Sequence, residues 1–199
     1  MRIMKCLVTI ALLGSASLSL AAGNPEAGEE KAGLCAGCHG DDGNAAAPIF
    51  PKLAGQHASF LIKQLHDFRS QKRVEPTMNA MAEPLTDEDV LDLAAFYTSK
   101  KITTEEAAPN QAGEKLYKAG NPATGVPACT GCHGPKGRGN PSAGFPSLHG
   151  QYAAYLEKTL HDFRSGERAN DSNEMMRKVA KHMSDEEIAA VSDYASTLK

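Results

Sequence analysis

The strongest constraint on the fold of this 199-residue chain is an internal duplication. Three sequence blocks occur twice in the same order, and the distance between copies grows from 94 to 95 residues, reaching 98 at the last predicted helix. Insertions therefore fall between blocks, as in a tandem repeat of one domain. The blocks are Cys-x-x-Cys-His at residues 35–39 and 129–133, Phe-Pro-x-Leu-x-Gly-Gln at residues 50–56 and 145–151, and His-Asp-Phe-Arg-Ser at residues 66–70 and 161–165.

The duplication predicts two domains, over residues 22–101 and 110–199. Residues 102–109 between them are rich in Thr, Glu and Ala and show no apolar periodicity, which is typical of a linker. The charge composition argues against a nucleic-acid-binding protein. The chain carries 21 basic and 24 acidic residues, and a nucleic-acid-binding protein needs a clear excess of Lys and Arg.

The N-terminus predicts export. Two basic residues precede an apolar run over residues 6–20, and small residues occupy both recognition positions of a cleavage site. This pattern indicates a signal peptide over residues 1–21 that is removed on secretion. An uncleaved membrane anchor is the alternative, but the run is shorter than the ~20 apolar residues that cross a bilayer.

Helical patterns recur in both domains, without the alternation that marks a strand, so we expect an all-α fold. Asn24 and Asn110 are placed to cap a first helix, and a middle helix follows each Gly-Gln pair. The last helix begins at Thr86 or Ser184, where Ser184 opens a capping box. With 6% aromatic residues and no Trp, a domain of this size has a small core. A large, covalently held apolar ring would complete it.

The two Cys-x-x-Cys-His motifs predict that ring to be haem. Positions i and i+3 share one face of a helix, so two thiols can add to the two vinyl groups on one haem edge while the adjacent His reaches the iron. We therefore expect two covalently attached haem c groups. The predicted attachment residues are Cys35, Cys38, Cys129 and Cys132, and the predicted proximal iron ligands are His39 and His133.

Three other uses of such motifs agree less well with the sequence. A zinc ribbon brings its cysteine pairs within one small fold, whereas these pairs are 94 residues apart. A thioredoxin-like site needs a β-α-β frame, for which no pattern is visible. Structural disulfides suit an exported chain, but they do not explain a His at the same place twice.

The ligand on the second face of each iron decides between a carrier and an enzyme, because an open position admits substrate. Met78 and Met176 each lie eight residues before the cap of the last helix, and we predict them as the second axial ligands. Aligning the middle blocks instead keeps Met81 as an alternative, and Met175 is the alternative in the second domain. Met183 matches Leu85 and is predicted to be core.

The remaining charged and imidazole side chains have simpler interpretations. We expect His66 and His161 to be solvated at the edge of the middle helix, because such a position is more common than a ligand. The basic stretch at residues 69–73 could dock an acidic partner, but cations at a solvated helix end are the preferred interpretation.

With these motifs, the mature chain resembles the dihaem cytochromes c of the c4 type. The resemblance implies two tandem class I cytochrome c domains related by a pseudo-two-fold axis, with haem propionate edges facing each other and His/Met-ligated iron. In such domains a Pro carbonyl orients the proximal His. Pro48 is the expected counterpart, and Pro141 is a poor match in the second domain.

The resemblance also implies a function, that of a periplasmic electron carrier and not an enzyme. The expected partners are redox proteins, with a bc1-type complex or a dehydrogenase as donor and a terminal oxidase as acceptor, and the carrier is soluble or loosely membrane-associated. The alternatives are an electron-transfer subunit of a dehydrogenase and a dihaem peroxidase-type enzyme. All four mature cysteines are needed for haem attachment, which leaves none as the axial Cys of related thiosulfate-oxidising dehydrogenases.

Overall fold

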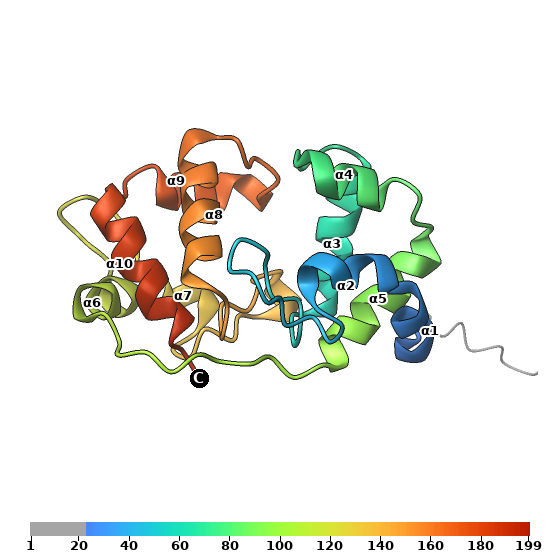
Figure 1. Cartoon of the computed structure of the whole chain (residues 1–199). Coiled ribbons are helices and arrows are strands. Elements are labelled where there is room, and N and C mark those ends of the chain that lie inside the picture. The colour runs from blue at the N-terminus through green and yellow to red at the C-terminus, as the bar shows by residue number, and fades with distance from the viewer. Residues whose placement is uncertain (1–22) are drawn as a thin grey trace, which may run out of the picture.

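The computed structural model describes residues 23–199, and the predicted signal peptide lies outside them. The fold is all-α, as expected, with two tandem helical domains (Figure 1). Within residues 23–199 the only β pairing is two isolated bridges, both in the second domain. The first domain contains α1 (Pro25–Lys31), α2 (Gly33–His39), α3 (Ala58–Arg69), α4 (Pro76–Ala82) and α5 (Asp87–Ser99). The second contains α6 (Gln111–Ala119), α7 (Thr130–His133), the 3₁₀ turn η1 (Pro141–Ala143), α8 (Ala153–Ser165), the 3₁₀ turn η2 (Ser172–Glu174), α9 (Met175–Ala180) and α10 (Asp185–Ser196).

The predicted helix starts are confirmed. The Asn24 side chain accepts from the backbone amides at the start of α1, and Asn110 does the same for α6. Thr86 and Ser184 cap α5 and α10, each with a full capping box. These local contacts fix where each helix begins, because they satisfy amide groups that have no partner within the helix.

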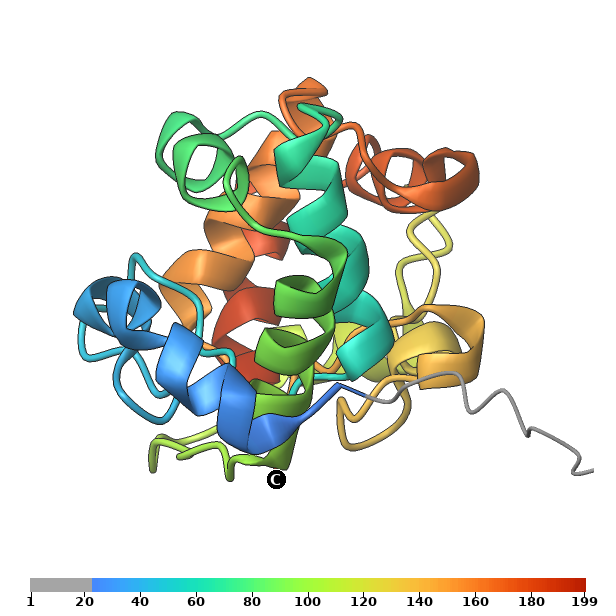
Figure 2. The same cartoon turned by 90° about the vertical axis from the view of Figure 1, so that its right-hand side faces the viewer.

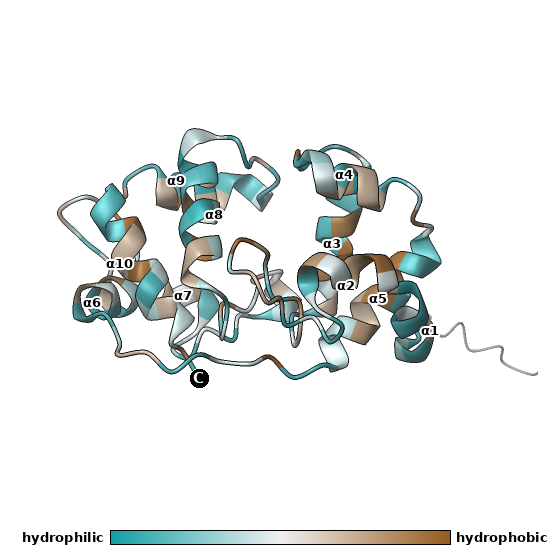
Figure 3. Ribbon diagram, in the orientation of Figure 1, coloured by the Kyte–Doolittle hydropathy of each residue, from teal (hydrophilic) through white to brown (hydrophobic). Residues whose placement is uncertain are grey.

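In each domain the first and last helices cross at very close range. A Cβ added to Gly28 would lie 2.1 Å from the Asp92 carbonyl oxygen, and one added to Gly113 would lie 1.9 Å from that of Ala190. Only glycine permits this approach, so it positions α1 on α5 and α6 on α10. Figure 3 shows that α1 is mainly hydrophilic whereas α5 carries many apolar residues.

Each domain has its own core. The core of the first domain centres on residues of α3 and α5, and the core of the second on residues of α6, α8 and α10. Met183 is 4% exposed within the second core, which confirms its predicted core role. The two domains lie side by side, with α3 and α8 on the sides that face each other and the linker running along one edge (Figure 1).

Viewed from the end of the molecule, the first domain lies in front of the second (Figure 2). None of the helices within residues 23–199 has the length and hydropathy needed to cross a membrane.

Candidate functional site

Each Cys-x-x-Cys-His motif folds as a short helix that ends at the histidine. In α2, His39 is 7% exposed and its Nδ1–H donates to the carbonyl oxygen of Pro51 at 2.9 Å. In α7, His133 is equally buried and donates to the carbonyl oxygen of Pro146 at 2.9 Å. This bond fixes the ring orientation and the tautomer, so that Nε2 is the nitrogen available to a metal.

The sequence-based prediction of the proline that orients each histidine is therefore wrong. The carbonyl comes from Pro51 and Pro146, and not from Pro48 or Pro141. Pro48 and Pro141 are exposed, and Pro141 begins the 3₁₀ turn η1. Pro51 belongs to the duplicated Phe-Pro block, and this equivalence between the two copies was the signal that could have identified it.

Burial keeps both imidazoles in the form that binds metal. It lowers the pKa of His39 and of His133, and this effect outweighs the opposing effect of the bond to each proline carbonyl. A neutral ring with a proton on Nδ1 presents a lone pair on Nε2. Both histidines thus present the Nε2 lone pair in the same way.

The first cysteine of each motif lies beside its domain core, and its thiol lacks the lowered pKa of a redox-active cysteine. Cys35 and Cys129 pack against their domain cores. Burial raises the pKa of the Cys35 thiol and raises that of Cys129 to about 11. A catalytic Cys-x-x-Cys pair has a lowered pKa instead. The two pairs also lie in different domains, which disfavours a shared zinc site.

The candidate methionines lie in the short helices before α5 and α10. Met78 is the third residue of α4, and Met176 is the second residue of α9. Met175 is 39% exposed, whereas Met176 is partly buried. Met78 and Met81 are both partly buried, so burial alone does not choose between them.

The other histidines behave as expected for helix edges. His66 and His161 are partly exposed, and the Nδ1 atom of each accepts from an arginine one turn further along, Arg69 at 2.8 Å or Arg164 at 3.0 Å. Neither side chain therefore offers that nitrogen to a metal.

The basic stretch at residues 69–73 is only in part a solvated helix end. Arg69 does pair with the exposed Asp87 at the start of α5. Arg73, however, turns into the interface between the domains, where it stacks on Phe68 at 4.6 Å and donates to Gln64 at 2.8 Å. The preferred interpretation from sequence was wrong for Arg73.

Arg73 has an equivalent in the second domain. Arg168 stacks on Phe163, also at 4.6 Å, and is 7% exposed. Both guanidinium groups reach Gln64, and Arg73 also donates to Tyr155 at 3.2 Å. Burial opposes ionisation of Tyr155, but the two cations outweigh it and lower the pKa of that phenol to about 8. This part of the interface therefore favours negative charge.

Two glutamines from the repeated Gly-Gln pairs join the domains reciprocally. Gln56 donates to the carbonyl of Ser147 at 2.9 Å and accepts from its amide at 2.9 Å. Gln151 forms the same two bonds with Lys52, both at 3.0 Å. Since Lys52 and Ser147 occupy equivalent places in the repeat, these contacts show the pseudo-two-fold relation directly.

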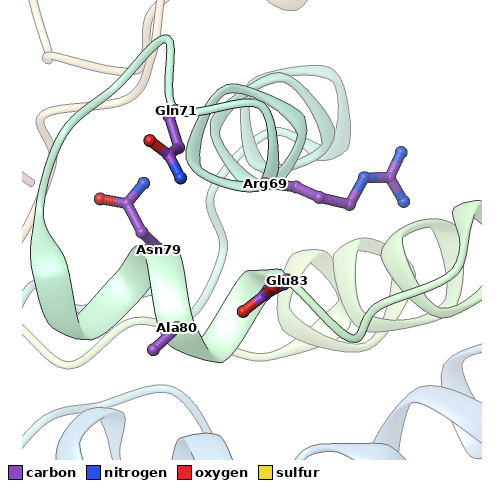
Figure 4. Close-up of a pocket in the computed structure, with 5 residues that line it drawn as sticks. All are labelled: Arg69, Gln71, Asn79, Ala80 and Glu83. Carbon is purple, nitrogen blue, oxygen red and sulfur yellow. The ribbon is translucent and has the colours of Figure 1, made fainter.

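A pocket of about 230 Å³ lies elsewhere, between the end of α3 and α4 (Figure 4). The amide groups of Gln71 and Asn79 face each other across it, and Arg69, Ala80 and Glu83 complete its lining. Its lining contains no Cys, His or Met, so it is separate from the motif residues.

Comparison with known proteins gives consistent results. The sequence matches the family described as cytochrome c twice, over residues 26–100 and 110–199. It is 54% identical over 180 residues to cytochrome c4 of Thiocapsa roseopersicina, covering 88% of this chain and 93% of that protein. The structure of reduced recombinant cytochrome c4 from Pseudomonas stutzeri superposes with a TM-score of 0.86 at 46% identity, covering 89% of this chain and all of the other.

A third relative has a more specific description. A thiosulfate dehydrogenase electron acceptor of Stutzerimonas stutzeri is 42% identical over 167 residues, covering 80% of this chain and 76% of that protein.

Proposed function

This chain belongs to the cytochrome c family, as a dihaem electron carrier of the c4 type, and we propose from that premise how its residues hold the haems and where it works. Two domains of this family bring two covalently bound haem c groups. When bound, each haem supplies a one-electron iron couple.

The duplicated His–Pro contact is the observation that carries the assignment of ligands. His39 and His133 are buried, neutral and oriented in the same way, so we assign them as proximal ligands. The cysteines of the same helical turns would form the thioether bonds. They are Cys35 and Cys38 in the first domain and Cys129 and Cys132 in the second.

The position of the insertion supports Met78 and Met176 as the second axial ligands. Arg73 and Arg168 are 95 residues apart, whereas the buried Ala82 and Ala180 that end α4 and α9 are 98 apart. The extra residues of the second domain accordingly lie before α9, where it has the 3₁₀ turn η2 (Ser172–Glu174). On this register Met78 matches Met176, and Met81 matches a valine, which cannot bind iron.

The arginines of the interface fit the remaining polar part of the cofactor. A haem carries two carboxylate groups, and Arg73 and Arg168 bring two guanidinium groups together where the domains meet. We assign both to the propionates. Burial, followed by the nearby Arg73 cation, lowers the pKa of Arg168. Pairing the two guanidinium groups with propionate carboxylates would relieve the repulsion between them.

A His and a Met on each iron would leave no position for an outside molecule. Thioether ligation favours reduced iron, and a haem held covalently with both axial positions filled changes little between oxidation states. We therefore propose a carrier that catalyses no bond-making reaction, working in the periplasm after removal of residues 1–21. Its donor is a bc1-type complex or a dehydrogenase, and its acceptor is a terminal oxidase.

A second candidate function is an electron acceptor dedicated to one dehydrogenase. The relative described as a thiosulfate dehydrogenase electron acceptor favours it. The two functions differ in kinetics: a dedicated acceptor is reduced by thiosulfate dehydrogenase and thiosulfate faster than by a bc1-type complex. Measuring both reduction rates on the same preparation distinguishes them.

The ligand assignment is tested by the weak near-infrared absorption of ferric iron bound to methionine. Met78→Ala should remove half of this band, and Met176→Ala the other half. Met81→Ala and Met175→Ala are matched controls that should retain it. A full band in Met78→Ala with loss in Met81→Ala would transfer the assignment to Met81.

Carbon monoxide tests the closed coordination separately. Its binding to the reduced wild-type protein should be slow, because a methionine must first dissociate. Fast stoichiometric binding at one haem would contradict the carrier and favour a peroxidase-type enzyme.

A further inference from the structure

One peptide group in each domain connects the proximal histidine to the other domain. The carbonyl oxygen of Pro51 accepts from His39, and the amide of the same peptide bond, which belongs to Lys52, donates to Gln151 Oε1 at 3.0 Å. His39 and Gln151 are therefore bonded to opposite ends of a single peptide unit.

The second domain repeats the arrangement in the opposite direction. His133 donates to the Pro146 carbonyl, and the amide of Ser147 in the same peptide bond donates to Gln56 Oε1 at 2.9 Å. Each histidine is thus linked through one peptide group to a glutamine of the partner domain.

The glutamines are held firmly in these positions. Gln56 is 8% exposed and Gln151 is 6% exposed. Each Oε1 accepts a second bond from the amide of the following residue, His57 at 3.0 Å or Tyr152 at 3.1 Å, while each Nε2 donates across the interface. Both amide groups have therefore one orientation that satisfies all partners, with the oxygen towards the peptide N–H.

A hydrogen bond at a peptide N–H polarises the peptide and makes its carbonyl a better acceptor, since bonds in a chain strengthen one another. A better acceptor at His39 Nδ1 gives the imidazole more anionic character, which stabilises ferric iron. We propose that Gln151 and Gln56 are positioning residues that set the reduction potential of the haem in the opposite domain. This inference rests on the assignment of His39 and His133 as iron ligands.

The experiment is a redox titration of the holoprotein that resolves both haems, with the haems assigned through the Met78 and Met176 variants. Gln151→Leu removes the acceptor at Lys52 N–H, so it should favour reduction of the first haem by about threefold to tenfold, the latter ~59 mV, and leave the second haem close to its wild-type value. Gln56→Leu should act on the second haem only. In the reduced proteins, solvent exchange of the Nδ1 proton should accelerate at the histidine of the affected haem alone.

A merely structural role of the glutamines gives a different result. Loosened domains would shift both potentials together. Tyr152→Phe is the matched control for this, because it removes the interdomain bond to the Ala45 carbonyl and leaves in place the hydrogen bonds of both peptide groups that accept from a histidine. Tyr152→Phe should leave both potentials unchanged. Shifts of both haems, of the haem in the mutated domain, or of neither would overturn the inference.

Two further readouts keep the test decisive. If Gln151→Leu does not accumulate, Gln151→Glu retains a stronger acceptor at Lys52 N–H, and the potential of the first haem should fall; a rise or no change would contradict the proposal. A wild-type protein without two His-ligated haems would refute the ligand assignment itself, whereas normal wild-type haems without crosswise shifts would refute only the role of the glutamines.

Discussion

The two domains share a backbone frame but stabilise it with different side chains. In both, a glycine of the first helix lies against a carbonyl of the last, Gly28 on Asp92 and Gly113 on Ala190. In the first domain Lys31 then binds the Asp92 carboxylate, whereas in the second the places of this ion pair are taken by a leucine and an alanine. The two domains have therefore kept the glycine at this contact, which no other residue can replace, and differ at the neighbouring residues, which can be replaced.

The aromatic residue at this helix crossing has changed sides. In the first domain the position after α1 is Ala32 and α5 supplies Tyr97. In the second domain α6 supplies Tyr117 and α10 supplies Ala195. Each tyrosine lies in its domain core beside the first cysteine of the motif. The core therefore requires one large ring at this place but not a particular helix to carry it.

The largest expected effect comes from deleting that ring. Tyr97→Ala should lower the free energy of unfolding by about 3–5 kcal/mol, because it leaves a cavity in a small core. Ala32→Tyr alone overpacks the crossing and costs about 1–3 kcal/mol. The double variant reproduces the arrangement of the second domain, so its loss should be smaller than the sum. Calorimetry on the wild type, the two single variants and the double variant measures the coupling between residues 32 and 97. If the two losses were strictly additive, the exchange of Ala and Tyr between these positions would be coincidental.

The close helix crossing gives the next effect. Gly28→Ala and Gly113→Ala each force apart a helix pair and should cost about 1–3 kcal/mol, each in its own domain. Gly33→Ala is the control, because an added Cβ there meets nothing within 4 Å and the residue lies in a helix. Denaturant unfolding followed by circular dichroism checks all three. Equal midpoints for Gly33→Ala and Gly113→Ala would mean that the crossing is not tight in solution.

Sequence reasoning succeeded where the determinants are local. The helix caps at Asn24, Asn110, Thr86 and Ser184 depend on contacts within one turn, and the repeat revealed the two domains. It failed where partners are distant in sequence. Arg73 has every local feature of a solvated helix end, and only its packing on the other domain makes it an interface residue.

The proximal carbonyl and the methionine register show why the rest could not be predicted. The Pro51 carbonyl reaches His39 because the loop between them closes back on the motif. No local pattern marks this closure, and only the duplicated Phe-Pro block could have indicated it. The choice of methionine depends on where three extra residues lie in the second domain. Asn173 and Glu174 there have φ values of 55° and 59°. Asn adopts this left-handed conformation more readily than most residues, but Glu does not, so no clear sign in the sequence indicated two such residues in a row.

The smallest expected effect concerns the ion pair that only the first domain has. Lys31 lowers the pKa of the Asp92 carboxyl and of Asp89 below the ordinary 3.8, and these bonds raise the pKa of Lys31 itself. A carboxyl group whose pKa is lowered by folding stabilises the fold at pH values above its pKa in the unfolded chain. This contribution is lost as the pH falls through its pKa in the folded state. The cation gives its contribution below about pH 10.5 and loses it only at higher pH. Both groups of this ion pair are therefore charged from about pH 4 to pH 10. Loss of the pair in acid should destabilise the first domain more than the second.

The magnitude is modest because Lys31 is partly exposed, so solvent screens the pair. Acid unfolding followed through NMR signals resolved for each domain should show the first domain losing stability earlier below pH 4. Replacing the pair with the residues of the second domain, Lys31→Leu with Asp92→Ala, should make the two acid transitions more alike. Lys118→Met, which removes an exposed pair with Glu114 on α6, is the control and should leave their order unchanged. Coincident transitions in the wild-type protein would show that the interface, and not the helix crossing, governs acid stability, since the domains would then unfold as one unit.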